Sequence, residues 1–168
     1  MTRPLKIIVA VGRGGEINYR NSLPWERIPR DMDHFRSLTK DSTVIMGRGT
    51  FESIGCRPLP CRENFVISRT LCGIEGIRII SSLQEALHIA TFEETFLIGG
   101  QELFRQALVS DWVSEVYLTR VHAEFPRATV FFQEKLMYGR FTDDTSFLVD
   151  DGDDGGYDVT YHRYVRIA

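Results

Sequence analysis

Residues 43–55 read TVIMGRGTFESIG, an apolar run that stops at two glycines on either side of an arginine. The β-branched residues in 43–46 predict a short buried strand, and the segment after it predicts a turn into a helix over about 51–54. Glycines let a ligand approach the backbone closely, and the free N–H groups at the start of a helix attract phosphate. The turn therefore supplies four candidate phosphate-binding residues: Gly47, Arg48, Gly49 and Thr50.

Two other predicted strands end in turns of the same kind. Residues 64–68 are followed by Arg69 and Thr70, and residues 95–98 are followed by Gly99-Gly100 and a helix over 101–108. Any one of these turns could simply reverse the chain, but three of them at successive strand ends favour a cofactor with several phosphates. The chain contains neither GxGxxG nor GxxxxGK[ST], which argues against a standard dinucleotide fingerprint and against a nucleoside triphosphatase.

The rest of the pattern alternates strands and helices before it becomes rich in strands. Predicted strands cover 5–11, 76–80, 115–122, 129–132, 139–148 and 157–167, and predicted helices cover 29–39 and about 82–90. Ser82 and Glu85 have the spacing of a capping box at the start of the second helix. Loops are predicted at 12–24, 56–63 and 149–156, and the acids of the last indicate a solvated hairpin turn rather than a calcium site. This order predicts an α/β fold with a mixed sheet, in which ligands bind at the carboxyl ends of strands.

The length and composition are typical of one globular domain. The chain has 168 residues, of which 43% are hydrophobic and 26% are charged, with a formal net charge of -3. This charge argues against nucleic acid and anionic membrane surfaces as partners, and no apolar run is long enough for a membrane helix. The N-terminus lacks the long apolar core of a signal peptide, so we expect a cytoplasmic protein. Cys56, Cys61 and Cys72 have neither a disulfide spacing nor a zinc-site spacing, and we expect no metal site.

Two charged residues are candidates for binding a small molecule. In the predicted helix 29–39, Asp31, Phe35 and Thr39 are four residues apart, which puts a carboxylate on an otherwise apolar face. Asp31 could be only a first-turn acid favoured by the helix dipole. Alternatively, it is a lone ionisable group in an apolar pocket, which could bind a protonated heterocycle or relay a proton. Arg62 could clamp a carboxylate with two hydrogen bonds or could simply lie on the surface.

Taken together, these motifs resemble those of the dihydrofolate reductase family. The resemblance rests on Leu23-Pro24-Trp25, Asp31, 44–48 with Thr50, 53–55, 57–60, 62–64, Ser68-Arg69, 98–100 and 117–119, which occur in the order and near the spacing typical of that family. It covers nearly the whole chain, and Asp rather than Glu at position 31 is similar to the bacterial branch. The resemblance implies one dihydrofolate-reductase-like domain over residues 1–168, with a mixed, mostly parallel eight-stranded sheet flanked by helices.

The resemblance also implies an activity. A member of the family would use NADPH to reduce 7,8-dihydrofolate to 5,6,7,8-tetrahydrofolate, by hydride transfer to pterin C6 with protonation at N5. Dihydrofolate and antifolate inhibitors would be its small-molecule partners, and we expect a monomer because a chain of this size buries its core without a partner. One alternative is a pyrimidine reductase of the same fold, against which Asp31 and Leu23-Pro24-Trp25 argue. The other is a non-catalytic protein that binds NADPH or a pteridine.

Roles follow from the resemblance residue by residue. Asp31 would hold the pterin and promote N5 protonation through water, Thr119 would hydrogen-bond to Asp31, and Trp25 would position a water. The other residues in contact with the substrate would be Ile8, Val9, Met32, Phe35, Ile54, Leu59, Ile98 and Arg62, the last on the glutamate carboxylate. The cofactor would contact Ala10, Ile17, Gly47, Arg48, Gly49, Thr50, Ser68, Arg69, Gly99, Gly100, Gln101, Glu102, Leu103 and Phe104. The arginines and hydroxyls among them would take the pyrophosphate and the 2′-phosphate, and a cis peptide bond would join Gly99 to Gly100.

Three positions depart from the family pattern. Asn18 stands where the family usually has glycine, and Gly49 lacks a side chain that helps to hold phosphate in some members. Ala128 stands where many bacterial members have an aspartate that latches the loop 12–24 closed. We expect altered closure of this loop, changed product release and somewhat weaker NADPH binding, rather than lost chemistry.

Overall fold

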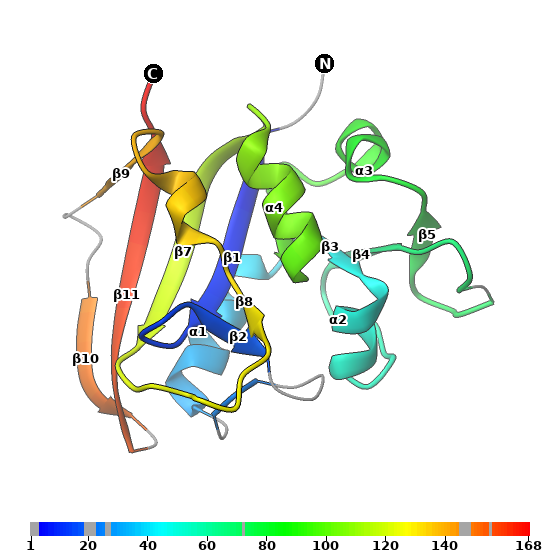
Figure 1. The fold of residues 1–168 in the computed structure, drawn as a ribbon. Helices are drawn as coiled ribbons and strands as arrows, with labels where there is room; N and C mark the ends of the chain where they lie inside the picture. Colours follow the sequence, from blue (N-terminus) through cyan, green and yellow to red (C-terminus); the bar gives the residue numbers. More distant parts are fainter. Residues whose placement is uncertain (1–3, 19–22, 26–27, 72, 145–148, 155) are drawn as a thin grey trace.

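A mixed β-sheet runs through the molecule, and helices pack on both of its faces (Figure 1). The computed structural model describes residues 4–18, 23–25, 28–71, 73–144, 149–154 and 156–168. The elements in chain order are β1 (Leu5–Val11), β2 (Glu16–Asn18), α1 (Pro29–Thr39), β3 (Thr43–Gly47), α2 (Arg48–Ser53), β4 (Glu63–Ile67), β5 (Arg78–Ile80), α3 (Leu83–Ile89), β6 (Thr95–Gly99), α4 (Gln101–Val109), β7 (Val113–Val121), β8 (Val130–Phe131), η1 (Glu134–Met137), β9 (Phe141–Asp143), β10 (Val149–Asp154) and β11 (Tyr157–Arg166).

The strand order confirms the predicted fold class. The sheet follows the order β10-β11-β7-β1-β6-β3-β4-β5, and β9 pairs with β11 beside this path. Neighbouring strands in the part β7-β1-β6-β3-β4-β5 of this order are parallel. Strand β11 pairs antiparallel with β7, β9 and β10. The carboxyl ends of β1, β3, β4 and β6 therefore lie at one edge, where ligands bind in open sheets of this kind.

The predicted helices are confirmed, with one difference in where a helix begins and one in how a helix is capped. Helix α2 begins at Arg48 rather than at 51, because extended Gly47 already forms its N-cap. Helix α3 is capped by Ser82, whose Oγ accepts a hydrogen bond from the Glu85 N–H at 3.1 Å. The Glu85 carboxylate instead accepts hydrogen bonds from the backbone and hydroxyl of Ser81, so only half of the capping box forms.

Three predictions about loops and edge strands were wrong. The predicted loop 12–24 contains β2, which pairs with β8 in a separate two-stranded sheet, so 129–132 adds no strand to the main sheet. The predicted hairpin loop 149–156 begins with β10, which pairs along β11. Of the predicted strand 139–148, the structure places 141–143 in β9, and 145–148 lie outside the described residues. Acid- and glycine-rich segments have low strand propensity, but pairing with an existing strand edge can override it.

The two faces of the sheet carry different apolar clusters. One face carries the large core, in which Val9 and Val11 of β1 pack with residues of α3, α4 and η1. The opposite face carries Ile8 and Ala10 of β1, because successive strand residues point to opposite sides. Helices α1 and α2 contribute Phe35 and Phe51 to this second face.

Within the described ranges, no helix combines the length and the apolar character needed to cross a lipid bilayer.

Glu63 ties the start of β4 to two threonines. Its carboxylate accepts hydrogen bonds from Thr43 Oγ1 at 2.6 Å, from Thr91 N at 2.9 Å and from Thr91 Oγ1 at 2.7 Å. Burial alone would raise the pKa of Glu63, but these hydrogen bonds outweigh that effect and hold the pKa below its usual value. Ionised Glu63 therefore stabilises the fold above its unfolded-state pKa, and this contribution is lost as pH falls through the folded-state pKa.

We expect Glu63→Gln to lower the free energy of unfolding by about 1 kcal/mol at neutral pH, a small value because solvent screens the partly exposed carboxylate. Urea unfolding followed by circular dichroism at a series of pH values measures this difference. The gap between wild type and variant should shrink as pH falls below the usual range for a glutamate. A gap that stays constant with pH would contradict the assigned role of the charge.

Candidate active site

The predicted catalytic residues lie where two apolar clusters meet on the α1 side of the sheet. One, here the Ile8 cluster, is made of Ile8, Val44, Met46, Phe51, Val66, Phe96 and Tyr117, with Phe35, Ile54, Leu59 and Ile98 among the residues packed against it. The other, here the Trp25 cluster, is made of Trp25, Ile28, Val121, Val159 and Tyr161, with Ala10, Phe125 and Tyr157 packed against it.

Asp31 and Thr119 both occupy the boundary between these clusters. On α1, Asp31 lies three residues after Ile28 of the Trp25 cluster and four before Phe35 of the Ile8 cluster, so all three share one helix face. On β7, Thr119 lies between Tyr117 and Val121, which share its face of the sheet. Thr119 is 3% exposed. The fold therefore brings a carboxylate and a hydroxyl to the same apolar region from different elements.

Trp25 supplies a hydrogen-bond donor in this region. The residue is 6% exposed, and its ring centroid lies 5.3 Å from that of Phe125. Its buried Nε1 makes no hydrogen bond with any residue that the structure describes. Because buried indole N–H groups usually find a partner, this donor is available to a water or a ligand.

The structure gathers most of the residues predicted to surround the pterin. Phe35, Ile54, Leu59 and Ile98 all pack against the Ile8 cluster, and Met32 lies next to Asp31 with 39% of its surface exposed. Val9 is a correction, because its side chain packs in the large core on the opposite face of the sheet. The one-residue alternation of β1 puts Ile8 on the α1 side and turns Val9 away, so Val9 can offer only its backbone there.

Arg62 is held in place by two neutral acceptors. Its Nε donates to the Pro60 carbonyl at 2.8 Å, and its Nη1 donates to Thr39 Oγ1 at 3.1 Å. Partial burial lowers the pKa of the Arg62 guanidinium, and nearby Arg36 adds to this effect while Cys61 opposes it. Arg62 has no carboxylate partner among the described residues. A partly buried cation without an anionic partner is suited to bind an anion from outside the chain.

The three glycine-rich or polar turns meet at the carboxyl edge of the sheet. A Cβ atom built on Gly99 would lie 2.6 Å from Thr50 Oγ1, so the first and third turns are in contact and only glycine fits at position 99 without a shift. Gly99 and Gly100 are joined by a cis peptide bond, as predicted. Arg48 donates a hydrogen bond to Thr70 Oγ1, which connects the first turn to the second. A Cβ on Gly49 would have no neighbour within 4 Å, so this position is open.

The start of α4 offers backbone donors to the same edge. Gln101, Glu102 and Leu103 occupy the first turn, where N–H groups have no partner within the helix. The N–H of Phe104 donates to the Gly100 carbonyl at 2.9 Å, and its ring packs edge-to-face on Phe132 in the large core. The backbone N–H of Phe104 is therefore already bonded within the helix, and its contact with the cofactor stays a prediction.

A comparison with family models assigns the chain. The model described as dihydrofolate reductase matches residues 4–166. The chain belongs to the dihydrofolate reductase family. The chain is 43% identical over 128 residues to the dihydrofolate reductase of Haemophilus influenzae, covering 76% of this chain and 78% of that protein. It is 35% identical over 124 residues to a bifunctional dihydrofolate reductase-thymidylate synthase of Paramecium tetraurelia, covering 73% of this chain but 27% of that longer protein.

A solved structure extends the likeness to three dimensions. The dihydrofolate reductase of Enterococcus faecalis, complexed with NADP(H) and RAB-propyl, superposes with a TM-score of 0.87 and 28% sequence identity, covering 100% of both chains. The fold derived above, with its mostly parallel sheet and its antiparallel strands at one edge, is thus a dihydrofolate reductase fold.

A pocket at the carboxyl edge of the sheet contains both predicted and unpredicted residues. It is lined by Arg48, Ile67, Ser68, Arg69, Thr70, Ser81, Ser82, Leu83, Leu103 and Gln106. Two guanidinium groups and several hydroxyls suit a phosphate, so the donor set fits a phosphorylated cofactor. Ser81 and Ser82 were missed because their helix-capping pattern explained them, although they follow β5 at the same edge as Ser68. Gln106 was missed because the sequence of a helix does not show which of its polar residues line a pocket formed with other segments.

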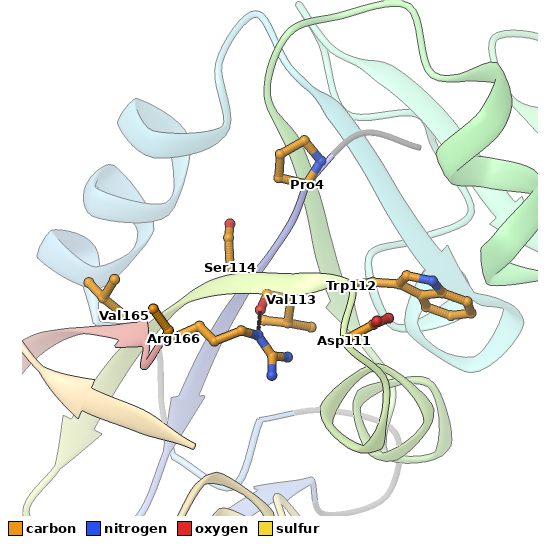
Figure 2. Close-up of a pocket in the computed structure, with 8 residues that line it drawn as sticks. Pro4, Asp111, Trp112, Val113, Ser114, Val165 and Arg166 are labelled. Atoms are coloured by element: carbon orange, nitrogen blue, oxygen red, sulfur yellow. Dashed lines mark hydrogen bonds between the residues drawn. The ribbon is translucent and has the colours of Figure 1, made fainter. Parts of the chain in front are cut away.

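A second depression lies away from the predicted site. It is lined by Pro4, Asp111, Trp112, Val113, Ser114, Val165, Arg166 and Ala168, at the ends of β1, β7 and β11 opposite to the candidate site (Figure 2). Arg166 donates from Nε to the Val113 carbonyl at 2.6 Å, which fixes the end of β11 against β7. None of the predicted site residues lines this depression.

The remaining cofactor residues lie around the loop after β1. Ala10 packs against the Trp25 cluster, and Ile17 of β2 packs against the large core. Asn18 pairs with Val130 through its backbone, and its side chain lies outside the described part of the chain. The Ala128 N–H donates to the Phe125 carbonyl at 3.0 Å within the segment that faces this loop. Altered loop closure at these departures stays a prediction.

Proposed function

We propose that this chain catalyses the NADPH-dependent reduction of 7,8-dihydrofolate to 5,6,7,8-tetrahydrofolate, with hydride transfer to pterin C6 and protonation at N5. The observation that carries the proposal is the position of Asp31, whose carboxylate lies at the boundary of two apolar clusters. The same chain has a pocket at the carboxyl edge of its sheet whose arginines and hydroxyls suit a phosphate. Membership of the dihydrofolate reductase family supports the same reaction. Residues 1–168 act as one domain in this proposal.

Asp31 binds and protonates the substrate in this proposal. Its carboxylate pairs with the amino-pyrimidine edge of the pterin, Thr119 orients that carboxylate, and the free Nε1 of Trp25 holds the water that delivers the proton to N5. The apolar side chains of Ile8, Met32, Phe35, Ile54, Leu59 and Ile98 exclude bulk water around the rings. Arg62 binds the glutamate carboxylate of the substrate.

The cofactor residues act by binding and orientation. When bound, NADPH supplies the hydride. Ala10 and Ile17 lie against the nicotinamide, and the backbone N–H groups of Gln101, Glu102 and Leu103 hold the pyrophosphate together with Thr50. Gly47, Gly49, Gly99 and Gly100 leave room for the cofactor to approach the backbone. Arg48, Ser68 and Arg69 take the 2′-phosphate.

The direct test follows NADPH consumption by absorbance with dihydrofolate, with and without an antifolate. We expect consumption that requires dihydrofolate and stops with the antifolate. Tight NADPH binding without consumption would refute the substrate assignment and favour the pyrimidine reductase or the binding-only alternative. Assay of the variant Asp31→Asn alongside the wild type shows that the activity belongs to this chain.

Arg69 gives a test of cofactor choice. It is exposed, lines the phosphate pocket and has no ion-pair partner among the described residues. We expect Arg69→Gln to raise the KM for NADPH by about 10- to 100-fold, the effect of one lost charge-assisted hydrogen bond, and to leave the KM for NADH unchanged.

Arg127→Gln is the matched control for this charge change, because Arg127 is equally exposed and lies outside the pocket. Its KM for NADPH should stay within about 2-fold of wild type, as expected of an exposed charge. Equal KM increases for NADPH and NADH in Arg69→Gln would refute the 2′-phosphate assignment.

We further propose that the protein acts as a cytoplasmic monomer without a nucleic-acid partner. The core clusters are closed by the chain's own helices, and the net charge of -3 opposes binding to a polyanion. The free, exposed thiols of Cys56 and Cys61 fit a compartment that keeps thiols reduced. Light scattering at increasing protein concentration tests the monomer, and a rising mass would refute it.

A further inference from the structure

The loop after β1 is folded around the carboxylate of Glu16. The Gly12 N–H donates to the Glu16 carbonyl at 2.9 Å, and the Gly15 N–H donates to the Gly12 carbonyl at 3.1 Å. A Cβ atom on Gly12 would lie 2.6 Å from Glu16 Oε2, and one on Gly14 would lie 2.5 Å from Oε1. The carboxylate therefore fills space that side chains at positions 12 and 14 would need.

Glu16 is buried and reaches across to a distant segment. The residue is 4% exposed, and its Oε2 accepts a hydrogen bond from the Phe125 N–H at 2.9 Å. The Phe125 ring lies 5.3 Å from the Trp25 ring and 5.8 Å from the Tyr157 ring, measured between centroids. Burying a carboxylate without hydrogen-bond partners costs free energy, so the fold keeps this contact and with it the position of the Phe125 backbone. Because the Phe125 ring packs on Trp25, the contact also fixes the position of Trp25.

A second connection joins the same two segments. Arg120 Nη1 donates to the Gly12 carbonyl at 3.0 Å and to Glu134 Oε2 at 3.0 Å. Burial alone would lower the pKa of Arg120, but Glu134, with a smaller contribution from Glu16, raises it above its usual value. The loop 12–16 is thus tied to residues 125–134 at both of its ends.

These ties surround the end of the site where the reaction takes place in the proposed function. Ala10 precedes the loop, Ile17 follows Glu16 directly, and Phe132 N donates to the Gly15 carbonyl at 2.8 Å to continue the β2–β8 pair. In Figure 1, β2 and β8 lie side by side. The buried carboxylate therefore contacts Phe125, whose ring packs on Trp25, and Ala10 and Ile17 flank the loop that folds around it.

We propose that Glu16 is a positioning residue for hydride transfer and protonation, acting through Phe125 on Trp25 and through the loop 12–16 on Ala10 and Ile17. This inference rests on the proposed reductase function. It predicts that loss of the Glu16 acceptor slows the chemical step more than it weakens substrate binding, because misplacement of the order of 1 Å costs rate. It also predicts that an uncharged acceptor of the same shape restores the positions.

The test compares Glu16→Ala, Glu16→Gln and the matched control Glu124→Ala, whose carboxylate is exposed next to Phe125. All are made in a Trp112→Phe background, which leaves Trp25 as the only tryptophan and reports its surroundings by fluorescence. We expect Glu16→Ala to shift Trp25 emission to the red and to slow single-turnover hydride transfer by about 10-fold or more, with KM for dihydrofolate within about 3-fold. Glu16→Gln should recover the emission and most of the rate, and Glu124→Ala should match the background protein.

Unchanged Trp25 emission and an unchanged hydride-transfer rate in Glu16→Ala would overturn the proposal, as would the same loss in Glu124→Ala. Should Glu16→Ala fail to fold, Gly14→Ala displaces the carboxylate without removing it, and the same two readouts decide. Failure of the parent protein to consume NADPH with dihydrofolate would refute the proposed function alone, because the Trp25 emission reports the positioning contact without any turnover.

Discussion

Asp31→Asn should lower kcat for dihydrofolate by about 100- to 1000-fold at neutral pH, the usual range for loss of a group that assists proton transfer. Asp31 lies at the boundary between the Ile8 and Trp25 clusters, where no other carboxylate of α1 shares its apolar face. An amide of the same shape keeps hydrogen bonds to the pterin but cannot promote protonation at N5. The loss should therefore shrink at acid pH, where solvent protonates dihydrofolate directly. Steady-state rates across a pH series measure this.

Asp33→Asn is the matched control, because Asp33 belongs to the same helix, is exposed and pairs with Arg36 at 3.2 Å. Its kcat should stay within about 2-fold of wild type, since an exposed i,i+3 ion pair contributes little. NADPH binding measured by fluorescence should be unchanged in both variants. Equal turnover by Asp31→Asn and wild type at every pH would refute the assigned role of Asp31.

Arg62→Leu should raise the KM for dihydrofolate by about 10- to 100-fold and leave the KM for NADPH unchanged, because a charge-assisted pair with the substrate's carboxylate is lost. The guanidinium is oriented by the Pro60 carbonyl and Thr39 Oγ1, and partial burial makes its unpaired charge costly. Arg62→Lys should lose much of the same affinity, since a lysine cannot reproduce the planar fork.

Two controls separate a carboxylate clamp from a general effect on the site. Thr39→Val removes the oriented acceptor from a fully buried position while keeping the side-chain shape, and it should raise the KM for dihydrofolate by a smaller factor of about 3. A dihydropterin that lacks the glutamate should be reduced equally well by wild type and Arg62→Leu. A loss with both substrates would show that Arg62 shapes the pocket rather than binding the glutamate.

The sequence by itself determined the parts of this protein that depend on local chemistry. The apolar run 43–46 predicted β3, the glycines at 47 and 99 predicted two turns, and the spacing from Pro29 to Thr39 predicted α1. The structure has all of these elements. Each rests on neighbours a few residues apart: side-chain periodicity, turn geometry and the rules for helix starts. The same local pattern placed Asp31 on an apolar helix face.

Only the tertiary structure decided what depends on contacts between distant segments. It put Val9 on the face away from the candidate site, and it paired β10 with β11 although β10 is rich in acidic residues. It also buried Glu16, whose carboxylate accepts a hydrogen bond from the Phe125 N–H. The alternation of a strand does not show which of its faces packs against which helix. An acidic residue in a glycine-rich loop, such as Glu16, is expected to be exposed to solvent, because its hydrogen-bond donor, the Phe125 N–H, is 109 residues away in the chain. Burial and pairing are properties of the folded chain, because they are set by the segments that close over a residue.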